Sequence, residues 1–431
     1  MRILIISGEV WQDGTNGGNV LSNIFDGIDA EFAQIYCSPG IPNNKLCNKY
    51  YQITDKTIID SIMHKTNTGK AFFLSTVKND DNIDQSMIKK HLKLRLTMFF
   101  VAREILWAMA DIYNDSLKEF IDEFQPDVIF APCYASHRML HLDRWVHEYT
   151  GKPMISYISD DNYSLRQLHI SPLYWIDRFV LRYNMRRTFK HYSLTYTMTE
   201  EQKTECENKL NANMKILRKS GIFEDCNYAV NETIKFIFAG GIYCGRWKTL
   251  ISIAEAIKEA NRDGKKAELH IYTRNDLSNK QGCILNDGEN SYVHDAVSQE
   301  EMFDRYSKSN VALHVESFDL KNRLLTRLSF STKIVDCLSS GCAVMAVAWE
   351  NHAGLRYLKR EDAAICVDDK KKIAETVHNI INDKKIILEY KEKAKMCLLK
   401  NHDPKQNREM IQQDFNECIC EDIQSKGELT Q

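Results

Sequence analysis

Short, almost wholly apolar runs recur along the chain, and a segment with the spacing of an amphipathic helix follows nearly every one. The first run reads RILIIS, and a later one reads KFIFA. Runs this short and apolar are typical of parallel strands covered by helices on both faces. The sequence therefore predicts an α/β protein with two doubly wound, Rossmann-like domains that face each other across a cleft. The expected strands are Arg2–Ser7, Glu31–Tyr36 and residues 127–132, 154–159 and 194–199 in the first sheet, and residues 235–239 and 268–273, Val311–Val315, Ala343–Val347 and residues 364–367 in the second.

The boundary between the two expected domains lies near residue 220, because the segment 220–233 is polar and shows no regular apolar spacing. We expect residues 1–220 to form the first domain and residues 221–395 the second. Residues 396–431 are predicted to be a helical end that can cross back to the first domain, with a frayed tail. A length of 431 residues agrees with two domains, because one hydrophobic core rarely supports so long a chain.

Composition and charge exclude several classes of protein. A formal net charge of −2 gives no support to nucleic-acid binding. The first apolar run is too short for a signal peptide, and no run reaches the roughly 18–20 apolar residues that span a bilayer. Thirteen cysteines are scattered along the chain, and only Cys418 and Cys420 are close together. This distribution favours free thiols in a reducing cytoplasm, so we expect a cytoplasmic protein.

The run STKIVDCLSSGCAV, residues 331–344, combines a helix start, a cation, a carboxylate and a glycine stop. Ser331 or Thr332 is expected to cap the helix, and its free amides and Lys333 could then hold a diphosphate. Asp336 lies on the same helical face as Lys333, where its carboxylate could accept hydrogen bonds from the hydroxyls of a ribose. The alternative is an ordinary amphipathic helix joined to a core strand.

A second glycine-rich run, GGIYCGRWK at residues 240–248, follows the first strand of the second domain. Glycine lets a phosphate approach the backbone, and the planar guanidinium of Arg246 matches diphosphate oxygens. With Lys333 it would stabilise the charge that a diphosphate gains as it leaves a sugar, while Glu316 could touch that sugar. The alternative is a surface arginine on a turn. Further candidates for donor binding are Gly241, Thr273 and Arg327.

In the first domain, Gly17 and Gly18 open the helix after the first strand and could also approach a phosphate, although a plain strand-to-helix turn is the alternative. His137, Asp160 and Asp161 follow two later strands and would face the cleft from the acceptor side. His137 could bind an acceptor hydroxyl, and an aspartate could act as a base if the reaction inverts the sugar. The acidic pair could instead hold a divalent metal, but we favour a site without metal because Arg246 and Lys333 already offer two cations.

Two stretches, residues 89–107 and 173–190, place cations beside leucine, phenylalanine and tryptophan in helical patterns. This composition suits docking on the anionic surface of a bilayer. The alternative is that the apolar faces pack into the first domain and the cations are solvated.

Together these motifs resemble the GT-B glycosyltransferases, most closely the family 4 group that builds bacterial polysaccharides. The resemblance implies a sugar-nucleotide donor, no metal or cofactor at the catalytic centre and, usually, retention of configuration. It assigns ribose binding to Asp336, phosphate binding to Arg246 and the amino-terminal glycine loop to Gly17 and Gly18. Two features depart from the family pattern. Ile251 replaces a lysine, so Lys248 or Lys333 must substitute for it, and the family's glutamate pair is represented only by Glu316 and Asp336.

The sequence therefore predicts a glycosyltransferase that moves a hexosyl unit from a nucleoside-diphosphate sugar to a glycan or lipid-linked saccharide. The expected donor is a UDP-sugar. The acceptor could be presented at the inner membrane face. Two alternatives stay open. One is a sugar-nucleotide 2-epimerase, which would share the two-domain architecture, and the other is a non-catalytic partner that binds a sugar nucleotide and activates another transferase.

Overall fold

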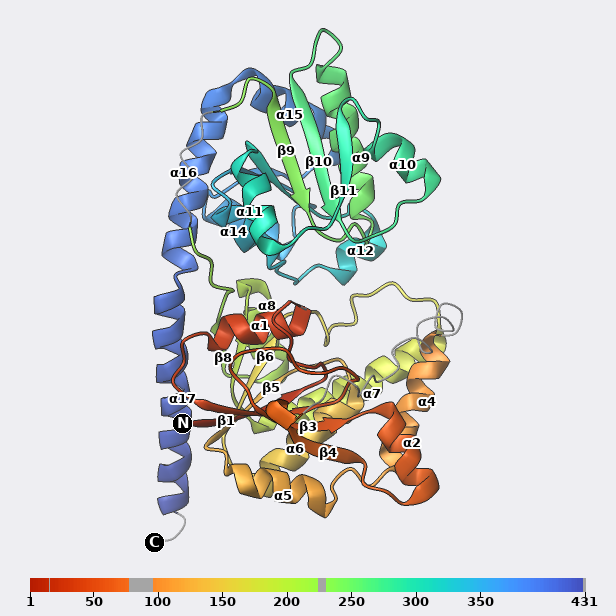
Figure 1. Ribbon diagram of the computed structural model, residues 1–431, viewed down its shortest axis with the longest axis vertical. Helices are drawn as coiled ribbons and strands as arrows, with labels where there is room; N and C mark the ends of the chain where they lie inside the picture. The colour runs from red at the N-terminus through yellow and green to blue at the C-terminus, as the bar shows by residue number, and fades with distance from the viewer. Residues whose placement is uncertain (15, 77–95, 224–229, 429–431) are drawn as a thin grey trace.

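The computed structural model describes residues 1–14, 16–76, 96–223 and 230–428. Two α/β domains lie one above the other, and the long helices at the carboxyl end run beside both (Figure 1). Each domain is built on one sheet of mainly parallel strands. This architecture confirms the predicted fold class.

The first sheet has eight strands in the order β4-β3-β2-β1-β5-β6-β7-β8, and within it only β4 runs antiparallel to its neighbour. Its strands are β1 Arg2–Ser7, β2 Glu31–Tyr36, β3 Lys49–Ile53, β4 Gly69–Phe73, β5 Val128–Pro132, β6 Met154–Ile158, β7 Tyr192–Thr197 and β8 Met214–Ile216. The helices of this domain are α1 Asn16–Phe25, α2 Asp55–His64, α4 Leu96–Met109, α5 Asp115–Phe124, α6 His137–Thr150, α7 Pro172–Thr188 and α8 Glu200–Leu210.

The second sheet has six parallel strands in the order β11-β10-β9-β12-β13-β14. Its strands are β9 Ile234–Ala239, β10 Ala267–Thr273, β11 Ser291–Asp295, β12 Val311–Val315, β13 Ala343–Val347 and β14 Ile365–Val367. The helices that follow them are α9 Arg246–Ala260, α10 Asn279–Leu285, α11 Gln299–Ser307, α12 Leu320–Leu325, α13 Lys333–Ser339, α14 Ala353–Arg360, α15 Ile373–Asn382, α16 Lys384–Asn401 and α17 Pro404–Glu428.

The central strands are apolar along their whole length because both faces of each sheet are covered. In β1, Ile3 and Ile5 belong to the core on one face, and Leu4 and Ile6 belong to the core on the other. A strand with two buried faces gains from an apolar side chain at every position, so the alternation of a half-exposed strand is absent. The RILIIS run follows directly from this burial.

The chain crosses between the domains at one edge, where two segments far apart in sequence are bonded together. The amide of Gly221 donates to the carbonyl of His402 at 3.0 Å, and the His402 ring lies 2.8 Å from the carbonyl of Lys219 through Nδ1. Asn407 donates to the carbonyl of Arg218 at 2.8 Å. The two crossings therefore form one hinge region.

Helix α17 completes the core of the first domain after the chain has already built the second. The ring of Phe415 lies 6.2 Å from the rings of Phe25 and Phe130, centre to centre. Asp414 accepts a hydrogen bond from the hydroxyl of Tyr196 at 2.7 Å and pairs with Lys215. Figure 1 shows α17 running along the side of the first domain down to the carboxyl terminus.

Candidate active site

The candidate site lies at the carboxyl ends of β9, β12 and β13, the middle of the second sheet. Because these strands are neighbours and parallel, the segments that leave them meet at one edge, which faces the first domain. The glycine-rich turn follows β9, Glu316 follows β12, and α13 begins beside them with Lys333. The topology therefore brings together three motifs that are spread over almost 100 residues.

Lys333 lies directly over the backbone of Gly240. The glycine has a φ of +151°, and a Cβ atom added to it would overlap the Lys333 Nζ. Burial lowers the pKa of Lys333, and the nearby Arg246 lowers it further. No carboxylate oxygen of a described residue lies within 4.0 Å of this ammonium. Glycine is thus required at this turn both for its conformation and for the space that the lysine fills.

Arg246 and Glu316 form a buried ion pair beside this lysine. An Nη of Arg246 lies 2.6 Å from Oε1 of Glu316, whose side chain is only 2% exposed. The hydroxyl of Thr249 donates to the Glu316 carbonyl at 2.7 Å, which fixes the end of β12 against α9. Burial raises the pKa of Glu316, but Arg246 outweighs this effect and holds the pKa below its usual value. Both groups are therefore charged, and with Lys333 they give the site one excess positive charge.

Two buried histidines, His314 and His352, flank the ion pair, and the sequence motifs predict a role for neither of them. Burial lowers the pKa of His314 to about 3 and also lowers the pKa of His352, so both rings are neutral near pH 7. Nδ1 of His352 accepts from the Leu355 amide at 3.3 Å at the start of α14. Their position at two central strands was the available signal, since His314 lies within β12, next to its last residue, and His352 lies shortly beyond β13.

Three buried polar atoms of this cluster have no hydrogen-bond partner among the described residues. They are Oε2 of Glu316 and Nε2 of both His314 and His352. A buried polar atom without a partner costs free energy, and such atoms usually find a partner in a bound group or in water. The cluster thus keeps unused hydrogen-bonding capacity at the edge of the sheet.

Asp336 is held by a residue of the hinge region. Nζ of Lys219 lies 2.6 Å from its carboxylate, and the aspartate side chain stays 44% exposed. Thr332, one of the two predicted cap residues of this helix, has the predicted position, but the expected capping hydrogen bond is absent. The backbone dihedral angles of Thr332 are helical. The amide of Ile334 instead donates to the carbonyl of Ser331 at 2.9 Å, as in a tight turn.

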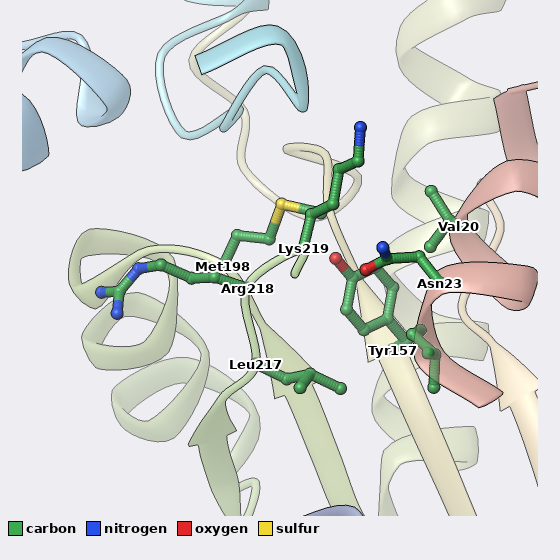
Figure 2. Close-up of a pocket in the computed structure, with 8 residues that line it drawn as sticks. Val20, Asn23, Tyr157, Met198, Leu217, Arg218 and Lys219 are labelled. Atoms are coloured by element: carbon green, nitrogen blue, oxygen red, sulfur yellow. The ribbon is translucent and has the colours of Figure 1, made fainter. Parts of the chain in front are cut away.

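A shallow pocket on the first domain lies below Lys219. Figure 2 shows Tyr157 and Asn23 on one side of it and Met198 on the other, with the Lys219 ammonium pointing up, away from Leu217. The pocket is lined by Val20, Asn23, Ile24, Tyr157, Met198, Leu217, Arg218 and Lys219. The lysine therefore links this pocket to Asp336 in the other domain.

The structure does not place Arg327, Asp160 or Asp161 in the cluster. Arg327 joins the domains by pairing with Asp161 at 3.0 Å and with Glu205 at 2.7 Å. Asp160 accepts a hydrogen bond from the hydroxyl of Ser329 at 3.0 Å. These contacts span the interface between the domains, so in this arrangement the three charged side chains hold the domains together.

The remaining candidates have partners within their own domains. His137 lies 2.9 Å from Asp177 through one ring nitrogen and 3.1 Å from Asn184 through the other. The Gly17 amide donates to the carboxylate of Glu9 at 3.3 Å, and Gly18 packs against the backbone of Gln12. Both glycines are in the first turn of α1.

Thr273 and Gly241 both help to shape the glycine-rich turn. The Thr273 hydroxyl donates to the side chain of Asn275 at 3.3 Å, and that side chain accepts from the amide of Ile242 at 2.9 Å. A Cβ added to Gly241 would overlap the ring of Tyr243. The end of β10 thus supports the turn that follows β9.

Gly240→Ala should displace Lys333 and weaken binding of any anionic ligand at the site by about tenfold, because one charged contact is worth about 1.5–3 kcal/mol. Gly264→Ala is the matched control. Gly264 also has a positive φ, of +121°, but nothing lies within 4 Å of an added Cβ. Both variants should lose some stability from backbone strain. Equal ligand affinity in the two variants, measured by titration calorimetry, would show that Lys333 takes no part in binding.

Comparison with known proteins finds a similar family in the second half of the chain and solved structures with a similar fold. A family model described as glycosyl transferase-like matches residues 248–413. A search of curated protein sequences finds no match. Sucrose-phosphate synthase from Thermosynechococcus elongatus has a similar structure, with a TM-score of 0.63 and 11% identity over 97% of this chain and 99% of that chain.

Two further structures are similar over nearly the whole chain. The α,α-trehalose-phosphate synthase (UDP-forming) from Burkholderia xenovorans, in complex with glucose-6-phosphate, has a TM-score of 0.58 and 11% identity over 96% of this chain and all of that chain. HepE from Anabaena, in complex with UDP, has a TM-score of 0.61 and 10% identity over 97% of this chain and 100% of that chain. The chain thus has the two-domain fold of the GT-B glycosyltransferases, and its second domain carries the glycosyl transferase-like segment.

Proposed function

We propose that this protein is a glycosyltransferase that moves a hexosyl unit from a nucleoside-diphosphate sugar to a glycan or a lipid-linked saccharide. One observation carries the proposal. Arg246, Lys333 and Glu316 meet over the glycine-rich turn at the carboxyl edge of the second sheet. Ligands of open α/β sheets bind at this edge, and here it faces the other domain of a GT-B fold.

The charges of this cluster fit the chemistry of a diphosphate leaving group. When the bond between sugar and diphosphate breaks, negative charge develops on the phosphate oxygens. Arg246 and Lys333 are fixed and largely buried, so they would stabilise that charge without first having to reorganise. Glu316 holds the guanidinium of Arg246 in place, and its second oxygen is buried without a hydrogen-bond partner among the described residues. We favour Lys333 over Lys248 as the substitute for the lysine of the family pattern, because Lys248 pairs with Asp319 outside the cluster.

The finer assignments extend the same proposal. A UDP-sugar is the first donor to test, because one similar enzyme is described as UDP-forming and another similar structure holds UDP. We propose a family 4-like, metal-independent reaction that retains the configuration of the sugar and serves polysaccharide synthesis in the cytoplasm. Asp336 would bind the ribose, and the pocket of Figure 2, on the first domain, would lie on the acceptor side.

A thermal-shift screen against sugar nucleotides and free nucleotides tests donor binding. A ligand at a hundred times its Kd should add about 2.7 kcal/mol to the free energy of unfolding. Selective stabilisation by one sugar nucleotide would identify base and sugar class, and no stabilisation by any of them would contradict the proposal. Incubation with that donor alone then separates a 2-epimerase, which would release a new sugar nucleotide without acceptor. Donor binding without transfer to any of a broad panel of acceptors would indicate the non-catalytic partner instead.

Asp336→Ala should weaken donor binding by about tenfold or more, because a carboxylate that accepts from ribose hydroxyls contributes about 1.5–3 kcal/mol. Asp115→Ala is the control, since Asp115 pairs with Lys118 at 3.0 Å on α5, far from the cleft. Donor affinity should be measured by calorimetry for both variants and for Lys219→Met, which frees Asp336 from its present partner. Unchanged affinity in Asp336→Ala would remove the ribose role.

A further inference from the structure

Helix α4 has its charged residues turned inward. Arg103 donates to Asp55 of α2 at 2.8 Å, and Trp107 donates to the same carboxylate at 2.7 Å. Glu104 pairs with Arg138 of α6 at 3.0 Å. The usual arrangement of a surface helix is the reverse, with apolar residues toward the core and charged residues toward water.

The outward side of α4 is correspondingly apolar. From residue 102 onward, the exposed residues of this helix are Ala102, Ile105, Leu106, Ala108 and Met109. Ile105 is 55% exposed and Met109 is 68% exposed. Residues 89–95 of the basic stretch predicted from sequence lie outside the described residues. For the part of α4 whose side chains are described, the alternative that its apolar residues pack into the domain holds for Trp107, which is buried, but not for Ile105, Leu106 and Met109.

Helix α7 shows the same inversion. The guanidinium of Arg178 is buried and donates to the carbonyls of Asp161 and Ser164 at 2.8 Å. Arg182 donates inward to the carbonyl of Tyr163 at 2.5 Å. The outward residues are spaced at three and four positions, as one helical stripe requires. They are Ile176, Phe179, Val180 and Tyr183, each between 48% and 61% exposed.

Cations continue this stripe at the end of α7. Arg186, Arg187 and Lys190 are exposed and follow Tyr183 along the chain, and Arg186 also donates through Nε to the hydroxyl of Tyr163 at 2.6 Å. Among the described residues of α2, α4 and α7, Asp177 has a half-exposed carboxylate, and it is paired with His137 at 2.9 Å. Helix α2 adds Ile59, Ile62 and Met63, and the loop before α7 adds Leu165, Leu168 and Ile170. These exposed residues of α2, α4, α7 and the loop before α7 are called the apolar-basic face below.

The elements of this face lie together at one side of the first domain. Figure 1 shows α2, α4 and α7 grouped on the side away from α16 and α17. Helix α4 packs against both α2 and α7. An apolar surface that spreads over three helices is larger than the scattered hydrophobic residues of an ordinary protein surface and marks an interaction site.

We infer that the apolar-basic face docks on the surface of an anionic lipid bilayer. Aliphatic and aromatic side chains would enter the boundary between headgroups and acyl chains, and the cations would lie at the level of anionic headgroups. Charge decides between a bilayer and a second copy of the chain. A two-fold contact through this face would bring the same three cations toward each other, whereas an anionic bilayer neutralises them.

Docking here would bring the cleft close to the membrane. The loop that precedes α7 contains Asp161, which contacts Arg327 of the second domain. The same loop ends in the exposed Leu168 and Ile170. A lipid-linked acceptor held in the bilayer would therefore lie beside the interdomain edge. This consequence depends on the proposed transferase function, while the docking itself does not.

Vesicle co-sedimentation of the full chain tests the inference. Wild type should bind vesicles of phosphatidylglycerol mixed with phosphatidylcholine, bind pure phosphatidylcholine less, and lose affinity as salt is raised. Phe179→Glu and Ile105→Glu should each lower the partition coefficient by about tenfold or more, because each replaces an inserted apolar side chain with an anion. The double variant Arg187→Gln/Lys190→Gln should lose about fivefold for each charge.

The control is Met396→Glu, a similarly exposed apolar position on α16 on the opposite side of the molecule. It should bind vesicles like wild type, and all variants should keep the thermal transition and nucleotide affinity of wild type. Failure of wild type to bind anionic vesicles would overturn the inference. So would equal loss in Phe179→Glu and Met396→Glu, or a dimer in solution that Phe179→Glu converts to monomer. A bilayer-binding protein that shows no transfer would refute the proposed function and leave this inference standing.

Discussion

Arg246→Met should lower the turnover of sugar transfer by about 10²–10³-fold, the usual cost of removing one fixed group that stabilises transition-state charge. The substitution keeps most of the side-chain volume and removes the planar cation. Because the charge on the diphosphate grows as the bond breaks, turnover should fall more than donor affinity. Steady-state kinetics that separate kcat from KM measure the two effects. Arg262→Met, an exposed arginine just beyond α9, is the control and should behave like wild type.

The loss of Arg246 also leaves Glu316 buried without its partner. Breaking one side of a buried ion pair costs about 3–5 kcal/mol, so Arg246→Met should unfold at a lower denaturant concentration. The double variant Arg246→Met/Glu316→Gln lacks the unpaired carboxylate, so it should recover much of the stability without recovering turnover. If turnover recovered together with stability, the role of Arg246 would be structural only.

Lys333→Met should separate catalysis from stability more cleanly. The ammonium is buried and lacks an ion-pair partner among the described residues, so its removal should leave the free energy of unfolding unchanged or higher. Turnover should fall by about 10–10²-fold, because one of two cations facing the diphosphate is lost. Chemical denaturation and transfer assays on the same preparation measure both quantities.

Two controls make the Lys333 prediction specific. Lys248→Met removes the other candidate lysine, which pairs with Asp319 at 2.8 Å, and should leave turnover near that of wild type. Burial and the neighbouring Arg246 lower the pKa of Lys333, so deprotonation removes this cation at a lower pH than in an ordinary lysine. The alkaline fall in turnover should therefore begin below the usual lysine range and be absent in Lys333→Met. A larger effect of Lys248→Met would reverse the assignment.

The fold was predictable because buried parallel strands have an unmistakable composition. All ten expected strands occur within a few residues of their predicted bounds. The four that were missed are β3, β4, β8 and β11, and all but β3 are edge strands of their sheets. Strand β8 has three residues, and β11 reads SYVHD with mixed exposure. Edge strands have one neighbour and partial burial, so their composition does not distinguish them from loops.

The site was predictable only in part, for a different physical reason. Strand-end position was enough to place Arg246, Glu316 and Lys333 at one edge, since the order of parallel strands fixes where their carboxyl ends meet. Sequence could not show that Arg327 would pair with Asp161 and Glu205, because these partners come from separate domains. Nor could it show that Lys219 would reach Asp336. Contacts across a domain interface leave no periodic signal in either segment.

The docking of α17 on the first domain has a consequence for biosynthesis. Phe415 packs against Phe25 and Phe130, which also contact each other, so this part of the core lacks a side chain until the ribosome has made more than 400 residues. The amino-terminal half therefore cannot reach its final packing as a nascent chain, although most of its strands emerge early. Folding of the first domain should instead be completed after synthesis, when α17 docks on it and the two domains then fold and unfold together.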